Sequence, residues 1–150
     1  LNDKVEKSYL LEKGDILFVR SNGNKKLIGR SMLVIELKEP ATFSGFTIRC
    51  RLEDEKLLPE FVCRVLKSKA IRKQLIDGGG GSSISNLNQK MLSALEIPIV
   101  DYAGQVNVLE KFNKLEKKFE EFFTKINKKL ELVNQLKSAI LAQELQSEAA

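Results

Sequence analysis

An apolar residue recurs every seven positions from Phe112 to Ile140, and this repeat constrains the fold more than any other feature of the chain. Such a heptad, with Lys and Glu between the apolar positions, is typical of a long helix in a coiled coil. No Pro or Gly follows Gly104, so nothing interrupts the helix. The pattern predicts a helix over residues 104–146, roughly 60 Å long at about 1.5 Å per residue. The residues at heptad positions a and d, which we call the seam, are Phe112, Leu115, Phe119, Phe122, Ile126, Val133, Leu136 and Ile140.

The seam requires a partner. Burying all of its side chains would contribute roughly 12–24 kcal/mol, at about 1.5–3 kcal/mol for each. The other residues form too small a globule to cover a rod of this length. We therefore predict a second long helix, with the rod serving in dimerisation or docking. The alternative is an ordinary core helix of one large domain.

Composition excludes several classes of enzyme. The chain has no histidine, so it can form neither a Ser-His-Asp nor a Cys-His nucleophile, nor a site with histidine ligands for a metal. Two cysteines, Cys50 and Cys63, cannot supply a four-ligand zinc site and fit a reduced, cytoplasmic setting. No signal peptide and no membrane-spanning run is present. Because residue 1 is Leu, we expect a processed, trimmed or partial chain.

Positive charge is concentrated in two runs that contain no acid. Residues 20–30 hold Arg20, Lys25, Lys26 and Arg30, and residues 64–73 hold a second group of Arg and Lys, in a chain whose net charge is +5. Clustered bases favour an anionic partner, with nucleic acid the first candidate. The alternative is loop charge that merely faces water.

Residues 1–101 have the pattern of a small α+β domain. Apolar runs predict strands at 16–19, 31–37 and 46–52. Pro59 opens a predicted helix over 59–77, and Asn86 is expected to cap a short helix that ends near Leu95. Residues 96–100 are predicted to form a closing edge strand, because Pro98 would not suit a central one.

A match to the pattern of metal-dependent nucleases carries little weight. Asp15 with Glu36 and Lys38 fits a loose D…E-x-K pattern, but this pattern is short enough to arise by chance. The alternation of residues 35–38 also turns Glu36 and Lys38 toward solvent. We expect no catalytic residue, no metal and no cofactor, and a binding module rather than an enzyme.

Several blocks of the chain resemble one known family. Residues 13–23, KGDILFVRSNG, are followed at the family's usual distance by residues 27–30 and 42–46. Residues 81–88 and 95–99 resemble the block that leads into that family's helix. These linked blocks are similar to those of the specificity subunits of type I restriction-modification enzymes.

The resemblance implies a target recognition domain at residues 1–101, lacking its N-terminal part, and a spacer helix at residues 102–150. A full subunit of the family has two such domains and two antiparallel helices, and each domain recognises half of a bipartite site in double-stranded DNA. The helices also dock methyltransferase and restriction subunits. For this chain the implied assembly is a homodimer through an antiparallel helix pair. Two alternatives stay open: a coiled-coil adaptor with no DNA role, and a fragment of a fused restriction-methylation enzyme.

DNA contacts are expected mainly from loops. The candidates for contacts to base edges are Arg20, Asn22, Asn24 and Ser44. The candidates for phosphate contacts are Lys25, Lys26, Arg30, Arg49 and Arg51. Gly80 and Ser82 lie in a glycine-rich loop that could approach the DNA backbone closely. For each of these residues the alternative is a solvated loop side chain.

Overall fold

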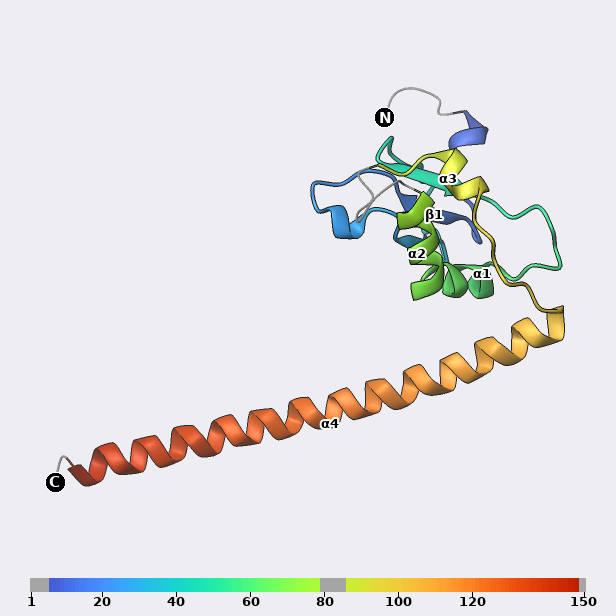
Figure 1. Ribbon diagram of the computed structural model, residues 1–150. Helices are drawn as coiled ribbons and strands as arrows, with labels where there is room; N and C mark the ends of the chain where they lie inside the picture. The colour runs from blue at the N-terminus through green and yellow to red at the C-terminus, as the bar shows by residue number, and fades with distance from the viewer. Residues whose placement is uncertain (1–5, 79–85, 149–150) are drawn as a thin grey trace. The chain divides into compact units, whose positions relative to one another are not determined.

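The computed structural model describes residues 6–78 and 86–148 (Figure 1). The chain divides into two compact units, residues 1–109 and residues 110–150. We call them the globular unit and the rod unit. The described residues of the globular unit form a three-stranded sheet, two short 3-10 helices and three α-helices, and also the first two turns of the long helix α4 (Tyr102–Glu148). This agrees with the predicted α+β class followed by a long helix.

The sheet is antiparallel, with β1 (Ile16–Val19) between β2 (Ser31–Leu33) and β3 (Thr47–Cys50). The prediction for β1 is confirmed. The second strand is shorter than the predicted 31–37, because its hydrogen-bonded pairing with β1 ends at Ile16, the first residue of β1. Val34 N–H still donates to the Asp15 carbonyl at 2.8 Å, just before β1. At Gly14, which has a φ of 95°, the chain turns away, so residues 35–37 have no strand to pair with in the described part of the chain.

Two helices replace the single helix predicted over 59–77, namely α1 (Pro59–Leu66) and α2 (Lys69–Gly78). The helical run is interrupted at Ser68, between the two helices. Its hydroxyl accepts a hydrogen bond from Ile71 N–H at 3.4 Å, which is the contact of an N-cap residue with the third residue of a new helix. Serine competes well for backbone donors at such positions, and the apolar periodicity of the sequence does not record that competition.

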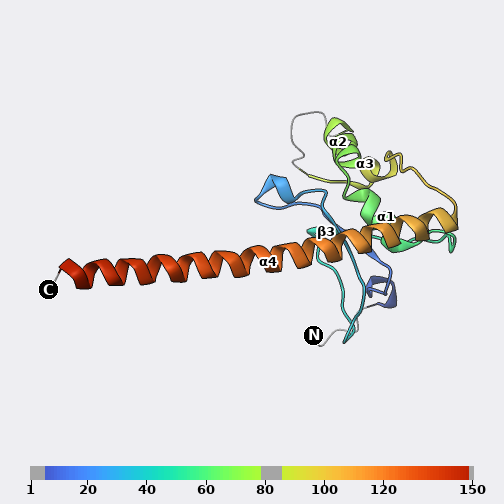
Figure 2. The ribbon, with the colours of Figure 1, turned by 90° about the horizontal axis from the view of Figure 1, so that it is seen from below.

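Helix α3 (Gln89–Ser93) lies beside α2 (Figure 2). Its cap is Asn88, whose side-chain oxygen accepts from Met91 N–H at 2.9 Å, so the predicted cap at Asn86 was wrong by two residues. The predicted edge strand at 96–100 is also absent from this described segment. Instead the side-chain amide of Gln74 donates to the Glu96 carbonyl at 3.1 Å and accepts from Glu96 N–H at 3.0 Å, which satisfies that backbone without a neighbouring strand.

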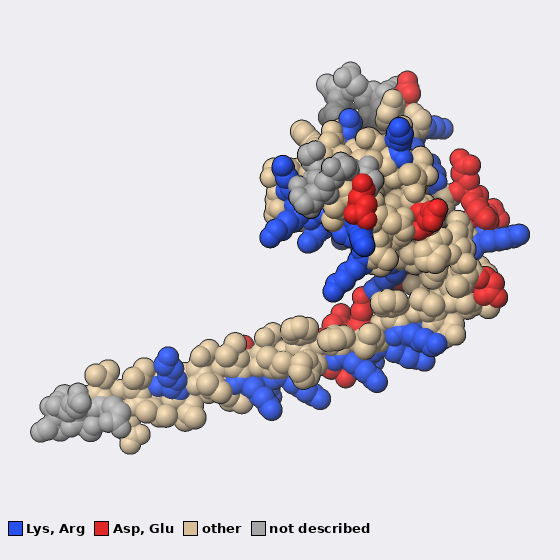
Figure 3. Space-filling view, in the orientation of Figure 1, with Lys and Arg blue, Asp and Glu red and all other residues tan. Residues whose placement is uncertain are grey.

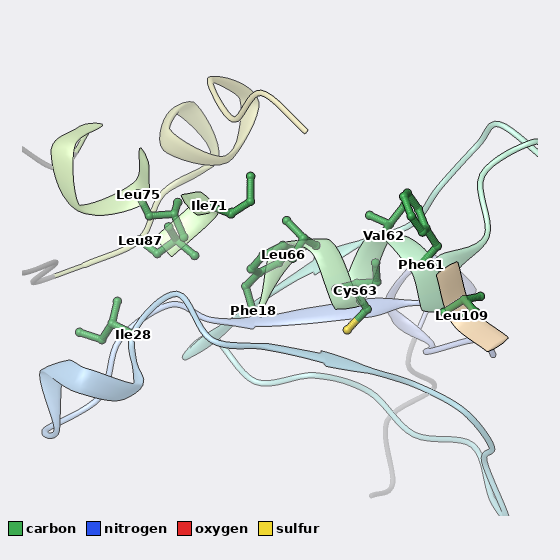
Figure 4. Close-up of a cluster of buried hydrophobic side chains, with 11 residues drawn as sticks. Phe18, Ile28, Phe61, Val62, Cys63, Leu66, Ile71, Leu75, Leu87 and Leu109 are labelled. Atoms are coloured by element: carbon green, nitrogen blue, oxygen red, sulfur yellow. The ribbon is translucent and has the colours of Figure 1, made fainter. Parts of the chain in front are cut away.

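The core of the globular unit forms between the sheet and the helices (Figure 4). β1 contributes Ile16 and Phe18, which point to one face of the sheet, as alternation requires. Ile28 enters from the loop after β1 and belongs to the same buried cluster as Leu75 and Leu87. The remaining core residues are Phe61, Val62, Cys63, Leu66, Ile71 and Leu109.

One buried polar side chain ties the start of α4 to the rest of the globular unit. Gln105 is 1% exposed. Its amide nitrogen donates to the carbonyls of Lys56 and Val100, each at 3.0 Å, and its amide oxygen accepts from Leu58 N–H at 2.9 Å. Every bonding group of the buried amide is therefore used except one lone pair.

The rod unit is the continuation of α4, and the prediction of a long uninterrupted helix is confirmed. Its seam residues are 41–62% exposed, from Ile126 to Leu136. None of the helices in the described part of the chain combines the length and apolar character needed to cross a membrane.

Candidate nucleic-acid interface

The loop at residues 20–30, which we call the basic loop, is anchored at its base by the sheet. Val19 N–H donates to the Arg30 carbonyl at 2.9 Å, and Gly29 N–H donates to the Val19 carbonyl at 2.8 Å. Gly29 has a φ of 77°, which favours glycine at this turn. Ile28, within the loop, is fully buried, so the C-terminal end of the basic loop is anchored to the core.

Within the basic loop, two asparagines shape the backbone. The side-chain oxygen of Asn22 accepts from Asn24 N–H at 2.8 Å, and that of Asn24 accepts from Lys26 N–H at 3.1 Å. Asn24 thereby caps the 3-10 helix η2 (Lys25–Leu27). Both lysines of η2 are exposed, so the asparagines present them to solvent on an ordered turn.

A hollow of about 450 Å³ joins the two basic runs of the sequence. We call it the basic hollow, and its lining residues are Lys26, Gly29, Arg30, Ser31, Leu66, Lys67, Lys69 and Arg72. None of these residues is acidic. Arg72 also donates a hydrogen bond to the Ile28 carbonyl, which links α2 to the basic loop. Figure 3 shows Lys and Arg atoms gathering over the end of the globular unit that carries η2.

A second hollow, of about 540 Å³, includes Arg20 in its lining. The lining combines guanidinium, amide and aromatic groups, and we call it the mixed hollow: Arg20, Phe43, Thr47, Ile48, Arg49, Asn88 and Gln89. Two backbone hydrogen bonds hold its parts together. Arg20 N–H donates to the Phe46 carbonyl and Leu87 N–H donates to the Arg20 carbonyl, both at 2.8 Å.

Arg49 is engaged within the globular unit. Its guanidinium donates to the carbonyls of Ser8 at 2.7 Å and Leu10 at 3.1 Å, and it lies 5.3 Å from the centre of the Phe43 ring. These contacts hold the segment before β1 against β3. Both hydrogen bonds use Nη1, so they occupy only part of the donor set of the guanidinium.

Arg51 is engaged more fully still. It forms ion pairs with Asp15 at 2.7 Å and with Glu12 at 2.8 Å. Burial by itself raises the pKa of Asp15, but the hydrogen bonds from Arg51 and from Glu12 N–H outweigh it and leave that pKa below its ordinary value. The same hydrogen bond to Asp15 raises the pKa of Arg51. The charge of Arg51 is thus matched by carboxylates of the same unit.

The remaining predicted site residues lie apart from the basic hollow or outside the described residues. The Ser44 hydroxyl accepts from Phe46 N–H at 3.3 Å in the turn before β3. Gly80 and Ser82 fall outside the ranges 6–78 and 86–148. Asp15, the first residue of the loose nuclease pattern, is committed to Arg51, and the described ranges contain no cluster of candidate metal ligands.

Several residues that line these hollows could not be placed there from the sequence. Lys67, Lys69 and Arg72 belong to the second basic run, so their charge was visible, but their position opposite the basic loop was not. Gln89 is uncharged, so the clustering of charge along the chain provided no signal for it. Burial raises the pKa of the Cys50 thiol, and the negative charge of Asp15 adds to the effect.

Comparison with known proteins gives two findings. A family model described as Type I restriction modification DNA specificity domain matches residues 3–132. The type I restriction enzyme StySPI specificity subunit of Salmonella potsdam is 31% identical over 155 residues, an alignment that covers 99% of this chain and 32% of the relative. The chain therefore spans about a third of the length of this relative.

Proposed function

The chain belongs to the family of type I restriction-modification DNA specificity domains, and from this premise we propose that its globular unit recognises one half of a bipartite site in double-stranded DNA. The observation that supports the proposal most is the basic hollow. Two runs of Lys and Arg, distant in sequence, converge on one concave surface with no acid among its lining residues. Phosphate contacts supply much of the affinity of proteins for DNA, so such a surface fits a DNA backbone.

In this proposal Lys25, Lys26 and Arg30 contact phosphates from the basic loop, and Lys67 and Lys69 contact them from the opposite wall. None of these side chains has a hydrogen bond or ion pair to another described residue, so their donors are available. Arg49 and Arg51 act differently: they hold the segment before β1 in place. Arg20, Asn22, Asn24 and Ser44 remain the candidates from the sequence for contacts to base edges.

The exposed seam supports a second part of the proposal, which concerns assembly. We propose that the rod unit pairs with another long helix, as an antiparallel homodimer of this chain, and docks methyltransferase and restriction subunits. The chain alone carries out no catalysis, and it acts on DNA in the cytoplasm. Metal-dependent DNA cleavage that disappears in Glu36→Gln would contradict the absence of catalysis.

The DNA proposal is tested by the salt dependence of binding. Lys25→Ala with Lys26→Ala should weaken binding to every duplex, and the slope of log affinity against log salt should fall by about 0.9 for each phosphate that the variant no longer neutralises. Lys67→Ala with Lys69→Ala should do the same from the opposite wall. Fluorescence anisotropy with a labelled duplex of random sequence, at several salt concentrations, measures both quantities.

The matched control is Lys13→Ala with Lys56→Ala. This variant removes the same two charges at exposed positions that line neither hollow. It should keep nearly the full slope. If all three double variants change the slope equally, binding follows net charge alone and the basic hollow has no special role. If the unaltered chain shows no salt-dependent binding, the adaptor interpretation is favoured.

A further inference from the structure

Gln89 combines the chemistry and the setting of a residue that recognises a base. It is the first residue of α3, it is exposed, and its side chain has no partner among the described residues. It lines the mixed hollow together with Arg20, whose guanidinium is likewise free of partners in the described part of the chain. Glutamine pairs with the donor and acceptor of adenine in the major groove, and arginine donates twice to guanine.

The asparagines of the basic loop are less suited to this task. Recognition of adenine by an amide needs both its oxygen as acceptor and its nitrogen as donor. The oxygens of Asn22 and Asn24 already accept backbone hydrogen bonds at 2.8 and 3.1 Å, and these bonds shape the turn. The Ser44 hydroxyl also accepts a backbone hydrogen bond, from Phe46 N–H, although this bond leaves its O–H donor unused. Gln89 keeps both groups of its amide available.

The backbone under Gln89 is ordered by contacts on both sides. Asn88 caps α3 through its bond from Met91 N–H at 2.9 Å, and Leu87 is fully buried. Leu87 N–H donates to the Arg20 carbonyl at 2.8 Å, so the segments that carry Gln89 and Arg20 are bonded to each other. The backbone positions from which the two side chains extend are therefore held at a fixed separation, as the recognition of two neighbouring base pairs requires.

We propose that Gln89 is a specificity-determining residue that contacts an adenine through its side-chain amide, while Arg20 contacts a guanine from the same hollow. This inference rests on the proposed DNA recognition. It adds a residue on α3 to a function assigned above to the loops. Gln89 acts on base identity, and the lysines of the basic hollow act on phosphates.

The test is a selection of duplexes from a pool randomised over a central segment, carried out with the full chain and its variants. Gln89→Ala should lose the preference for adenine at one position, and affinity for the selected duplex should fall by about 5- to 150-fold. Gln89→Glu should instead replace adenine by cytosine at that position, because a carboxylate accepts from the cytosine amino group. Alanine is a good helix former and glutamate suits a first helical turn, so both variants should keep α3.

Gln135→Ala, the same change on an exposed position of the rod unit, serves as the control and should leave the selected sequences unchanged. If Gln89→Ala and Gln89→Glu select the same sequences as the unaltered chain with equal affinity, the inference is overturned while the DNA proposal stands. A general loss of affinity without any change in base preference also overturns it. If the unaltered chain selects no preferred sequence, sequence recognition itself fails and the inference with it, and the salt-dependent binding of the unaltered chain to random duplexes then shows whether non-specific binding remains.

Discussion

The two units of this chain treat similar apolar side chains in opposite ways. In the globular unit Ile28 is fully buried in a core that it shares with residues of α2 and of the segment before α3, whereas in the rod unit Ile126 is 41% exposed on the part of α4 whose described side chains are all exposed. Local sequence explains neither outcome by itself, because both residues lie among lysines. What differs is the number of chain segments that converge on the side chain.

The polar groups show the same contrast. Burial in the globular unit extends to Gln105 and Asp15, and each has enough hydrogen bonds to offset the loss of water. The rod unit buries no described side chain and so has no such requirement. A unit that covers its own apolar surface must also satisfy its buried polar groups, while the rod unit leaves its seam exposed.

The largest expected effect is the loss of self-association when charge is placed in the exposed seam of the rod unit. Phe119→Asp with Ile126→Asp places carboxylates in the seam, where pairing with a second helix would bury them at a cost of several kcal/mol each. Light scattering should then report monomers in place of dimers. Asn113→Asp with Asn127→Asp adds the same charges away from the seam and should leave the mass unchanged. An unaltered mass in the seam variant would contradict self-association through the rod.

The next effect concerns the stability of the globular unit and uses a matched pair of isoleucines. Ile28→Ala should lower the free energy of unfolding by about 2–5 kcal/mol, because it removes a fully buried side chain. Ile35→Ala removes the same atoms at a position that is 71% exposed, and should change the free energy of unfolding by less than about 0.5 kcal/mol. Urea denaturation measures both values. Equal costs would mean that Ile28 does not anchor the basic loop.

The smallest expected effect concerns the stability that the buried carboxylate of Asp15 gains from Arg51. Arg51→Met leaves the carboxylate of Asp15 without its main partner and should cost about 1–3 kcal/mol at neutral pH. In the folded chain the pKa of Asp15 lies below its ordinary value of 3.8, so the stabilisation is present above that pH and is lost as the pH falls through the folded pKa. The difference between variant and unaltered chain should therefore shrink in acid. Arg30→Met, at an exposed position without such a partner among the described residues, should show no comparable dependence on pH.

Periodicity predicted the elements that long repeats specify and missed those that single contacts decide. The seven-residue repeat sufficed for α4, and the apolar run at 16–19 sufficed for β1. The Ser68 hydroxyl accepts from the first turn of α2 where the two helices separate, and the side chain of Gln74 bonds to the backbone of Glu96 where a strand was predicted. Neither contact leaves a trace in the spacing of apolar residues.

The residues of the candidate site likewise separate into those that a sequence pattern predicted and those that single contacts decide. Charge clustering alone was enough to single out the basic loop and the second basic run. It could not show that Arg72 bonds to the Ile28 carbonyl and brings the two runs to one hollow. Nor could it separate Arg51, whose charge is matched by Asp15 and Glu12, from lysines that have no partner in the described part of the chain.

The contacts of Gln105 determine where the chain can be cut when the globular unit is fused to another protein. The side chain belongs to α4 by secondary structure, but its hydrogen bonds go to Lys56, Leu58 and Val100, and the next turn places Leu109 in the core. A chimaera cut at the start of the helix would leave these backbone groups without their partner and remove Leu109 from the core. The boundary between the two units lies after residue 109, so the globular unit should be transplanted with the first two turns of α4 attached.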